Sequence, residues 1–260
     1  FGYNLVIMGG VLMMPDFTTA LQIKRVPSVY TAIITVMMGA AFIGAIISGP
    51  LADSIGRRGL SIICAVLSIL GDLLLVSANN VSMFYAGRAI AGFSVGVLSM
   101  VLPLYISELA PFNFRGRAIA LDQFFIILGI SIAFWAAYGA ASLKQNEFWR
   151  VPLGIQLIPA LVFGMALMYI PQSPRYLVQK HRDEEALLVL ALIRGDGTVE
   201  HKAVQMEFAE IKQTLMFEQK YNKIGYRYLF RLGCDRNPRR LLLGILAQVF
   251  QQLTGANTLM

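Results

Sequence analysis

The sequence predicts an all-α membrane protein, and three observations support this fold class. Of the 260 residues, 57% are apolar, and the mean hydropathy is +0.63. Only 14% are charged, against roughly 25% in soluble globular domains. The apolar residues also form blocks of about 20 residues, the length that crosses about 30 Å of hydrocarbon at about 1.5 Å per residue. The near-absence of charge inside these blocks argues against the alternative, a soluble enzyme with a large core.

The apolar blocks follow one another along the whole chain and predict its membrane spans. They lie at residues 2–15, 31–50, 59–78, 82–105, 118–141, 151–171 and 240–260. The first begins beside Phe1 and the last runs to Met260, so we expect both outer helices to be incomplete and the chain to be a fragment. A truncated gene product is the alternative to a cropped sequence. We expect a six-helix bundle at 1–171, a cytoplasmic helical segment at 172–239 and the start of a seventh helix at 240–260.

The positions of lysine and arginine predict which ends of the spans are cytoplasmic, because cytoplasmic loops carry an excess of these residues. Arg57 and Arg58 follow the second span, and Arg115 and Arg117 follow the fourth. The segment after the sixth span is also rich in basic residues, so these three connections share the cytoplasmic side. The net charge of +7 is spread among loops. It therefore reflects membrane topology, and we expect no nucleic-acid partner.

Residues 172–239 interrupt the apolar pattern with a charged segment that predicts short helices. Apolar side chains recur at helical spacing between residues 198 and 219. They are Val204, Phe208, Ile211 and Leu215. A preceding helix is expected at about 184–194, because Gly195 follows it as a natural stop. The amphipathic helix either lies on the lipid headgroups or packs in a small bundle under the spans.

Other kinds of site find no support in the sequence. Cys64 lies in the third span and Cys234 in the cytoplasmic segment, so we expect free thiols and no disulfide. His181 and His201 lack neighbouring ligands at metal-binding spacing, so we expect no metal site. The chain also has no phosphate-binding glycine loop and no nucleophile paired with a base. We therefore expect neither an enzyme nor a cofactor.

Short motifs occur in a fixed order across the chain. Between the second and third spans lie Gly49, Asp53, Gly56, Arg57 and Arg58. The fourth span and the turn after it contain Gly87, Arg88, Gly92, Gly96, Pro103, Tyr105, Glu108, Pro111, Arg115 and Gly116. The sixth span closes on Pro171-Gln-Ser-Pro-Arg175, and the seventh holds Gln251-Gln-Leu-Thr-Gly-Ala-Asn257. In this order and spacing, the chain resembles the sugar porters of the major facilitator superfamily over its whole length.

This resemblance implies the amino-terminal half of a twelve-helix major facilitator fold, with substrate held between two halves. The implied partners are a small-molecule sugar, the lipid bilayer and the carboxyl-terminal half of the same chain. The implied location is the plasma membrane, as an integral multi-pass protein. Trp149 and Arg150, together with the length of the cytoplasmic segment, resemble the fungal or plant branch.

Charged residues of both signs at the cytoplasmic helix ends predict a gate. They are Asp53, Arg57, Arg58, Glu108, Arg115 and Arg175. The topology rule explains the positive residues but does not require acidic partners. We therefore expect carboxylate and guanidinium pairs that hold the inner side closed by joining two halves, and the resemblance implies the same role. Gln172 stands where the family has Glu, which predicts a weaker latch.

Amide side chains within apolar helices are the candidates for sugar binding. They are Gln123, Gln251, Gln252 and Asn257, with Gln156 as a further candidate. An amide both donates and accepts hydrogen bonds, as each sugar hydroxyl does. From the residues alone, a hydrogen bond between helices is the commoner role for a polar group in a span. The resemblance instead assigns the first four amides to the substrate. Gln156 is the weaker candidate, and Phe1 is a candidate for an aromatic lining.

The first span carries the prediction on energy coupling. Proton-coupled relatives have Gly-Tyr-Asp there, and the carboxylate pairs with the arginine of the fourth helix. This chain has Gly2-Tyr3-Asn4, and an amide cannot titrate, so Arg88 has no proton-switchable partner at that position. The sequence therefore predicts facilitative transport of a hexose or pentose. Asp72 and Asp122 are possible substitute acids. They leave a proton-coupled sugar, polyol or quinate symporter as an alternative, beside a sugar sensor that does not transport.

Overall fold

The computed structural model describes residues 1–21, 27–142, 148–194, 198–221 and 237–253. These residues form α-helices joined by short turns, and no strand occurs among them, which confirms the predicted all-α class. The helices are α1 (Gly2–Leu12), α2 (Pro15–Ala20), α3 (Pro27–Ile55), α4 (Arg57–Val76), α5 (Val81–Leu109), α6 (Arg115–Ser142), α7 (Arg150–Ile155), α8 (Leu157–Tyr169), α9 (Pro174–Gln179), α10 (Asp183–Arg194), α11 (Lys202–Tyr221) and α12 (Asn237–Leu253).

The chain divides into two compact units, Phe1–Gln205 and Met206–Met260. The first unit contains α1 to α10, the boundary falls within α11, and α12 belongs to the second unit. The expected division of the chain at residues 171 and 239 stays a prediction.

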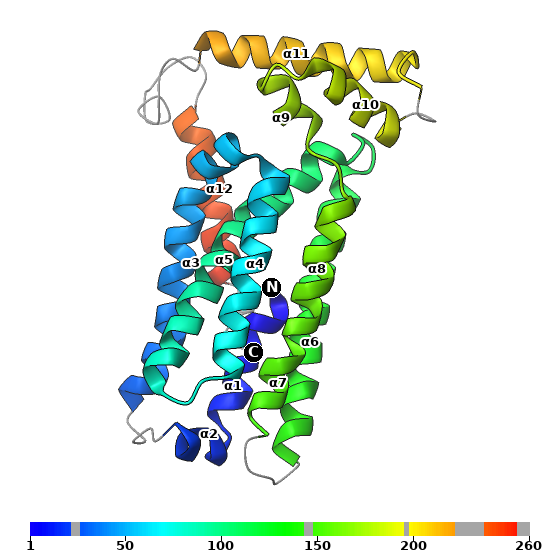
Figure 1. The fold of residues 1–260 in the computed structure, drawn as a ribbon. Helices are drawn as coiled ribbons and strands as arrows, with labels where there is room; N and C mark the ends of the chain where they lie inside the picture. Colours follow the sequence, from blue (N-terminus) through cyan, green and yellow to red (C-terminus); the bar gives the residue numbers. More distant parts are fainter. Residues whose placement is uncertain (22–26, 143–147, 195–197, 222–236, 254–260) are drawn as a thin grey trace. The chain divides into compact units, whose positions relative to one another are not determined.

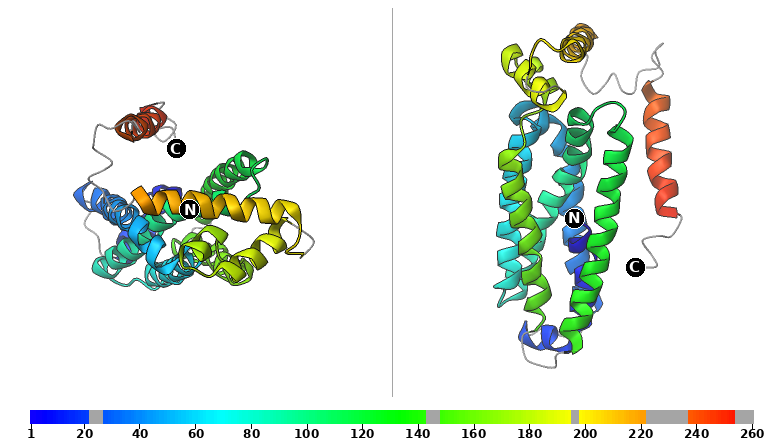
Figure 2. Two further views of the ribbon diagram at one scale, coloured as in Figure 1. Left: turned by 90° about the horizontal axis from the view of Figure 1, so that it is seen from above. Right: turned by 90° about the vertical axis from the view of Figure 1, so that its right-hand side faces the viewer.

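The first unit is a helical bundle with a short helix at one end and two at the other. Helices α1 and α3 to α8 run side by side, α2 lies at one end, and α9 and α10 lie at the opposite end (Figures 1 and 2). Helix α5 packs against both α3 and α4, α1 packs against α6, and α4 packs against α8. The turns that precede α4 and α6 lie at the same end as α9 (Figure 1), which agrees with the basic side predicted from the loops.

Among the described residues, five helical stretches are long and apolar enough to cross a membrane. They are Val29–Ile55, Arg57–Val76, Val81–Leu109, Arg115–Ser142 and Arg150–Tyr169. They coincide with the second to sixth predicted spans, and the first predicted span begins with the shorter apolar helix α1. Large apolar side chains such as Phe42, Ile46 and Trp135 point outward and are 60% exposed or more. In a membrane this surface faces lipid, which is why the chain tolerates it.

Glycines allow α3 and α5 to approach closely. A Cβ atom on Gly92 would lie 2.5 Å from the carbonyl oxygen of Met37, and one on Gly96 would overlap the carbonyl oxygen of Ala41. Small residues at such crossings let two backbones pack at short distance, and this packing supplies the attraction that apolar area alone does not supply in lipid. The fourth-span glycines of the sequence motif are therefore packing residues on α5.

The sixth span is interrupted in the middle, which the sequence analysis did not predict. Helix α7 ends at Ile155, α8 begins at Leu157, and Gln156 lies between them. Pro159 follows three residues later and has no backbone N–H to donate to the carbonyl of Ile155. The backbone of Gln156 stays in the right-handed helical region, at φ −60° and ψ −27°, so the span continues in nearly the same direction.

The charged segment after the sixth span forms the expected helices. Helix α10 covers the predicted helix at about 184–194, and α11 covers the predicted amphipathic one. On α11, Val204 and Leu215 are buried, whereas Phe208 and Ile211 are partly exposed. Ser173 directly precedes α9, and its hydroxyl accepts a hydrogen bond from the backbone N–H of Tyr176 and so caps the helix.

Candidate functional site

A buried polar network lies inside the bundle of the first unit. It consists of Asn4 on α1, Asp72 on α4, Arg88 on α5 and Gln156 between α7 and α8. The four residues are 4%, 1%, 1% and 4% exposed, in that order. Polar and charged groups are costly within spans and persist there when they are paired or functional. Four such residues from four elements therefore mark this region as a candidate functional site.

Each member of the network has a partner on another helix. The guanidinium of Arg88 donates from Nη1 to Oδ1 of Asn4 over 3.4 Å. The amide Nε2 of Gln156 donates to Oδ1 of Asp72. Asp72 and Arg88 also lie close enough to attract each other electrostatically. The network thus links α1 to α5 and α4 to the break in the sixth span, and it brings together all three residues predicted for coupling.

Close backbone packing fixes the position of this network. A Cβ atom on Gly71 would lie 2.8 Å from the backbone nitrogen of Ala91, and one on Gly87 would lie 3.0 Å from the carbonyl oxygen of Gly71. Because each glycine precedes a network residue, Asp72 and Arg88 are carried on directly apposed turns of α4 and α5. The hydroxyl of Tyr3 donates to the carbonyl of Pro152 over 2.7 Å and joins α1 to α7 nearby.

The candidate sugar-binding amides lie in different surroundings. Gln123 is exposed on α6 next to Phe124 and Phe125, whose rings meet edge to face with centroids 5.8 Å apart. Gln156 is buried and donates a hydrogen bond to Asp72. It therefore belongs with the residues predicted for coupling, and it does not share the exposed surroundings of Gln123. Phe1 is 49% exposed at the start of α1.

The remaining sugar-binding candidates fall at the end of the chain. Gln251 and Gln252 lie within the helical bounds of α12, but their side chains lie outside the described residues, as does the whole of Asn257. Their role in sugar binding stays a prediction.

A second polar cluster lies at the end of the bundle that carries α9. Arg57 forms an ion pair with Glu108 on α5, from Nε to Oε2 over 3.2 Å, and the two side chains are each 6% exposed. Its Nη2 atom also lies 3.3 Å from the more exposed carboxylate of Asp53. Ser173 donates a hydrogen bond from its hydroxyl to Oε2 of Glu108 over 2.5 Å. This arrangement ties the start of α4 to the end of α5 and to the cap of α9.

Arg58 joins α4 to the end of α8. Its side chain donates from Nε to the carbonyl of Leu167 over 3.1 Å and from Nη2 to the carbonyl of Met168 over 2.7 Å. The last carbonyls of a helix have no partner within the helix, and a cation there also opposes the negative end of the helix dipole. The backbone N–H of Arg58 donates to Oε1 of Gln172 over 3.1 Å, so the neutral amide acts as an acceptor at the start of α4.

The turn between α3 and α4 depends on a glycine. Gly56 has φ +93°, which residues with a side chain rarely adopt. A Cβ atom there would also lie 2.6 Å from Nε2 of Gln172 and 2.8 Å from Cε1 of Tyr176. The motif glycine is thus required both by backbone conformation and by the close approach of the segment that follows α8.

Three residues of this cluster received no role from the sequence. Tyr105 donates its hydroxyl hydrogen to the carbonyl of Pro171, and Tyr176 donates to the carbonyl of Ser54 over 3.1 Å. Ser173 caps α9 and binds Glu108. Tyr105 and Ser173 lie within motifs that the sequence already indicated as important. The spacing of residues along the chain does not show, however, which distant motifs contact each other.

The six predicted gate residues are only partly brought together. Asp53, Arg57, Arg58 and Glu108 share the cluster, and the partners described above all lie within the first unit. Arg115 is exposed at the start of α6, and Arg175 is half-buried in α9. The cluster therefore holds together the helices of one unit. A latch between two halves of a longer protein stays a prediction.

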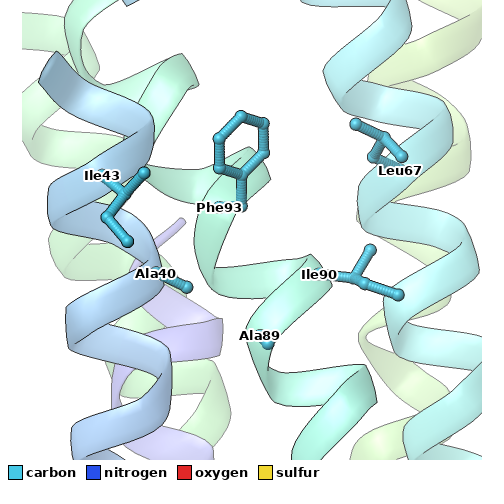
Figure 3. A pocket seen from close by; sticks show the side chains of 6 residues that line it. All are labelled: Ala40, Ile43, Leu67, Ala89, Ile90 and Phe93. Carbon is cyan, nitrogen blue, oxygen red and sulfur yellow. The ribbon is translucent and has the colours of Figure 1, made fainter. Parts of the chain in front are cut away.

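An apolar hollow of about 310 Å³ lies between α3, α4 and α5. Figure 3 shows the six side chains that line it, namely Ala40, Ile43, Leu67, Ala89, Ile90 and Phe93. None of these side chains donates or accepts a hydrogen bond, whereas each sugar hydroxyl needs both kinds of partner. This hollow is therefore unsuited to binding a sugar.

Comparison with known proteins gives consistent matches over the whole chain. The family model described as "Sugar (and other) transporter" matches residues 1–260. An MFS glucose transporter of Aspergillus flavus is 32% identical over 268 residues, which cover 100% of this chain and 50% of the relative. The human proton myo-inositol cotransporter is 32% identical over 263 residues, which cover 100% of this chain and 39% of the relative.

A solved structure shares the fold. The E. coli proton:xylose symporter XylE, bound to 6-bromo-6-deoxy-D-glucose, superposes with a TM-score of 0.80 at 27% identity. The match covers 99% of this chain and 57% of that structure. The chain thus spans about half the length of the proteins that it matches.

Proposed function

Because the chain belongs to the sugar transporter family and has the fold of the amino-terminal half of a major facilitator protein, we propose that the full-length protein moves a monosaccharide across a membrane. The substrate is a hexose or pentose, and the protein works by alternating access. It is a multi-pass membrane protein and no enzyme, and the plasma membrane is its proposed location. The substrate site lies between two such halves, so the 260 residues alone are not expected to transport.

The observation that supports facilitative transport is the contact between Arg88 and Asn4. The amide oxygen of Asn4 lies 3.4 Å from Nη1 of Arg88. By the sequence resemblance, this is the position at which proton-coupled members of the family have a carboxylate. An amide neither gains nor loses a proton in the physiological range. The contact between α1 and α5 therefore has the same charge in every state of the transport cycle, and the sugar moves down its own gradient.

We assign sugar recognition to amide side chains that the sequence predicts as ligands. Gln123 is exposed on α6 and free to meet a ligand from outside this unit. Gln251, Gln252 and Asn257 are its proposed partners from the seventh helix. Gln156 is not included among these ligands, because its amide already donates a hydrogen bond to Asp72. In the full-length protein, Gln123→Ala should raise KM for the sugar, whereas Ser131→Ala on the same helix should leave KM unchanged.

Uptake measurements test the proposal directly. The full-length protein would be expressed in a yeast that lacks its own hexose carriers, and uptake of labelled glucose and xylose would be followed with and without a protonophore. We expect saturable uptake that stops at equal concentrations inside and outside and does not respond to the protonophore. Accumulation above the external concentration that collapses with the protonophore would contradict the facilitative proposal while leaving sugar transport intact.

Proton-coupled transport is the second candidate, and the buried carboxylate of Asp72 favours it. This carboxylate is 1% exposed and attracts Arg88, so a titratable group acts on Arg88 although Asn4 itself cannot titrate. In that case the substrate class widens to polyols and to acids such as quinate. A sensor that binds sugar without moving it is a further alternative. Surface expression with sugar binding but no uptake would favour that reading.

A further inference from the structure

We propose that Asp72 on α4 is the counter-charge of Arg88, and that it replaces the carboxylate whose place on α1 is taken by Asn4. The negative charge has thus moved from a helix that contacts α6 to one that packs on α5 itself. Asp72 would balance the charge of Arg88 inside the bundle in the same way whether the carrier is facilitative or proton-coupled. Only the uptake measurement below depends on the proposed transport function.

A counter-charge is needed because Arg88 is buried. Its side chain is 1% exposed within the apolar helix α5, and the partner that contacts it, Asn4, is neutral. A guanidinium keeps its charge in proteins, and burying it without compensation is strongly unfavourable. A single amide oxygen at 3.4 Å supplies one weak hydrogen bond and no net charge. Something else in the surroundings must balance the positive charge.

Asp72 is placed to supply that balance. It is 1% exposed, and its charge attracts that of Arg88. The backbone of the preceding residue, Gly71, lies against both Gly87 and Ala91, the neighbours of Arg88 on α5. Among the acidic residues described within the spans, Asp122 is instead half-exposed on α6, and Asp53 and Glu108 lie in the cluster at the α9 end. Asp72 is therefore the acidic side chain buried in the same part of the bundle as Arg88.

Gln156 holds Asp72 in position. Its Nε2 donates to Oδ1 of Asp72, so the carboxylate is held by a residue of the sixth span. The second carboxylate oxygen, Oδ2, is buried, and among the described residues it has no hydrogen-bond partner. The same holds for Nε of Arg88. Asp72 Oδ2 is thus an unused acceptor and Arg88 Nε an unused donor, and the two groups carry opposite charges. They fit a pair that attracts across a short distance and that small helix movements would bring into direct contact.

The test moves the charge back to α1 in the full-length protein. Three variants are compared with the wild type: Asp72→Asn, the double variant Asn4→Asp with Asp72→Asn, and Asp16→Asn as a control that removes one acidic group from α2 outside the network. For each variant, the uptake rate of labelled glucose in intact cells and the thermal midpoint of the detergent-solubilised protein are measured, with surface expression as normalisation.

We expect Asp72→Asn to lower the midpoint and to reduce uptake about tenfold or more, because a buried charge loses its counter-charge. The double variant should recover most of the midpoint, since the net charge around Arg88 is restored, and Asp16→Asn should behave as the wild type. A wild-type midpoint for Asp72→Asn would overturn the inference, as would a double variant no better than Asp72→Asn. The midpoint reports this result even if glucose is not the substrate, so failure of the proposed function is seen separately as lack of uptake by the wild type.

Discussion

Arg57 and Glu108 show how a single pair sets the stability of the cluster beside α9. Their contact of 3.2 Å is buried on both sides. Replacing a buried ion pair with apolar residues is often tolerated, but removing one partner leaves an isolated charge. Glu108 also accepts the hydroxyl of Ser173, so one carboxylate serves two neighbouring elements. Asp53 adds a second, more exposed carboxylate to Arg57.

Glu108→Gln should therefore lower the free energy of unfolding by about 3 kcal/mol, because it leaves the guanidinium of Arg57 buried without its buried counter-charge. The thermal midpoint of the purified full-length protein would measure the change. Glu185→Gln is the matched control, because it removes an ion pair with Arg182 on the surface. The side chains of Arg182 and Glu185 are 57% and 49% exposed, and exposed pairs contribute little to stability. Equal midpoints for Glu108→Gln and the wild type would contradict the assigned role.

At the scale of elements, glycines decide how α5 packs. Gly96→Ala should destabilise the protein by about 1–3 kcal/mol, because the added methyl group would overlap the carbonyl of Ala41 on α3 and force the helices apart. Gly39→Ala on α3 is the control, because a Cβ atom there would meet nothing within 4 Å. That change should be neutral or slightly stabilising, since Ala is the better helix former. The same loss of stability in both variants would contradict the role of close packing at Gly96, because helix propensity favours alanine at both positions.

The elements themselves could be predicted from the sequence, because each span is a local run of apolar residues of membrane length. The break at Gln156 could have been found from Pro159, since proline removes a helical hydrogen bond wherever it occurs. Contacts between elements could not be found in this way. Gln156 lies 84 positions from Asp72, and nothing in their spacing indicates which helix faces which. For the same reason, the contacts of Tyr105 and Ser173 were missed although their motifs were noted.

The whole molecule has a sidedness that combines the loop charges with the fold. The end of the first unit that carries α9 also carries the buried ion pair and the turns with Arg57 and Arg115. Positive residues stay on the cytoplasmic side during insertion, whereas the acidic partners serve packing. The same residues are thus expected to orient the protein, and their contacts tie its helices together. At the opposite end, the turn between α4 and α5 contains Asn79 and Asn80 and no basic residue.

Accessibility to a membrane-impermeant thiol reagent tests this orientation. In a full-length protein whose native cysteines, including Cys64 and Cys234, are all replaced by Ser, a cysteine introduced as Asn80→Cys should react in intact cells, because this turn is expected to face outward. A cysteine made as Phe112→Cys, between α5 and α6, should react only after permeabilisation, although Phe112 is 87% exposed. Labelling of the first in intact cells also supports a plasma-membrane location. If Phe112→Cys reacts in intact cells and Asn80→Cys does not, the orientation is inverted and the α9 end is not cytoplasmic.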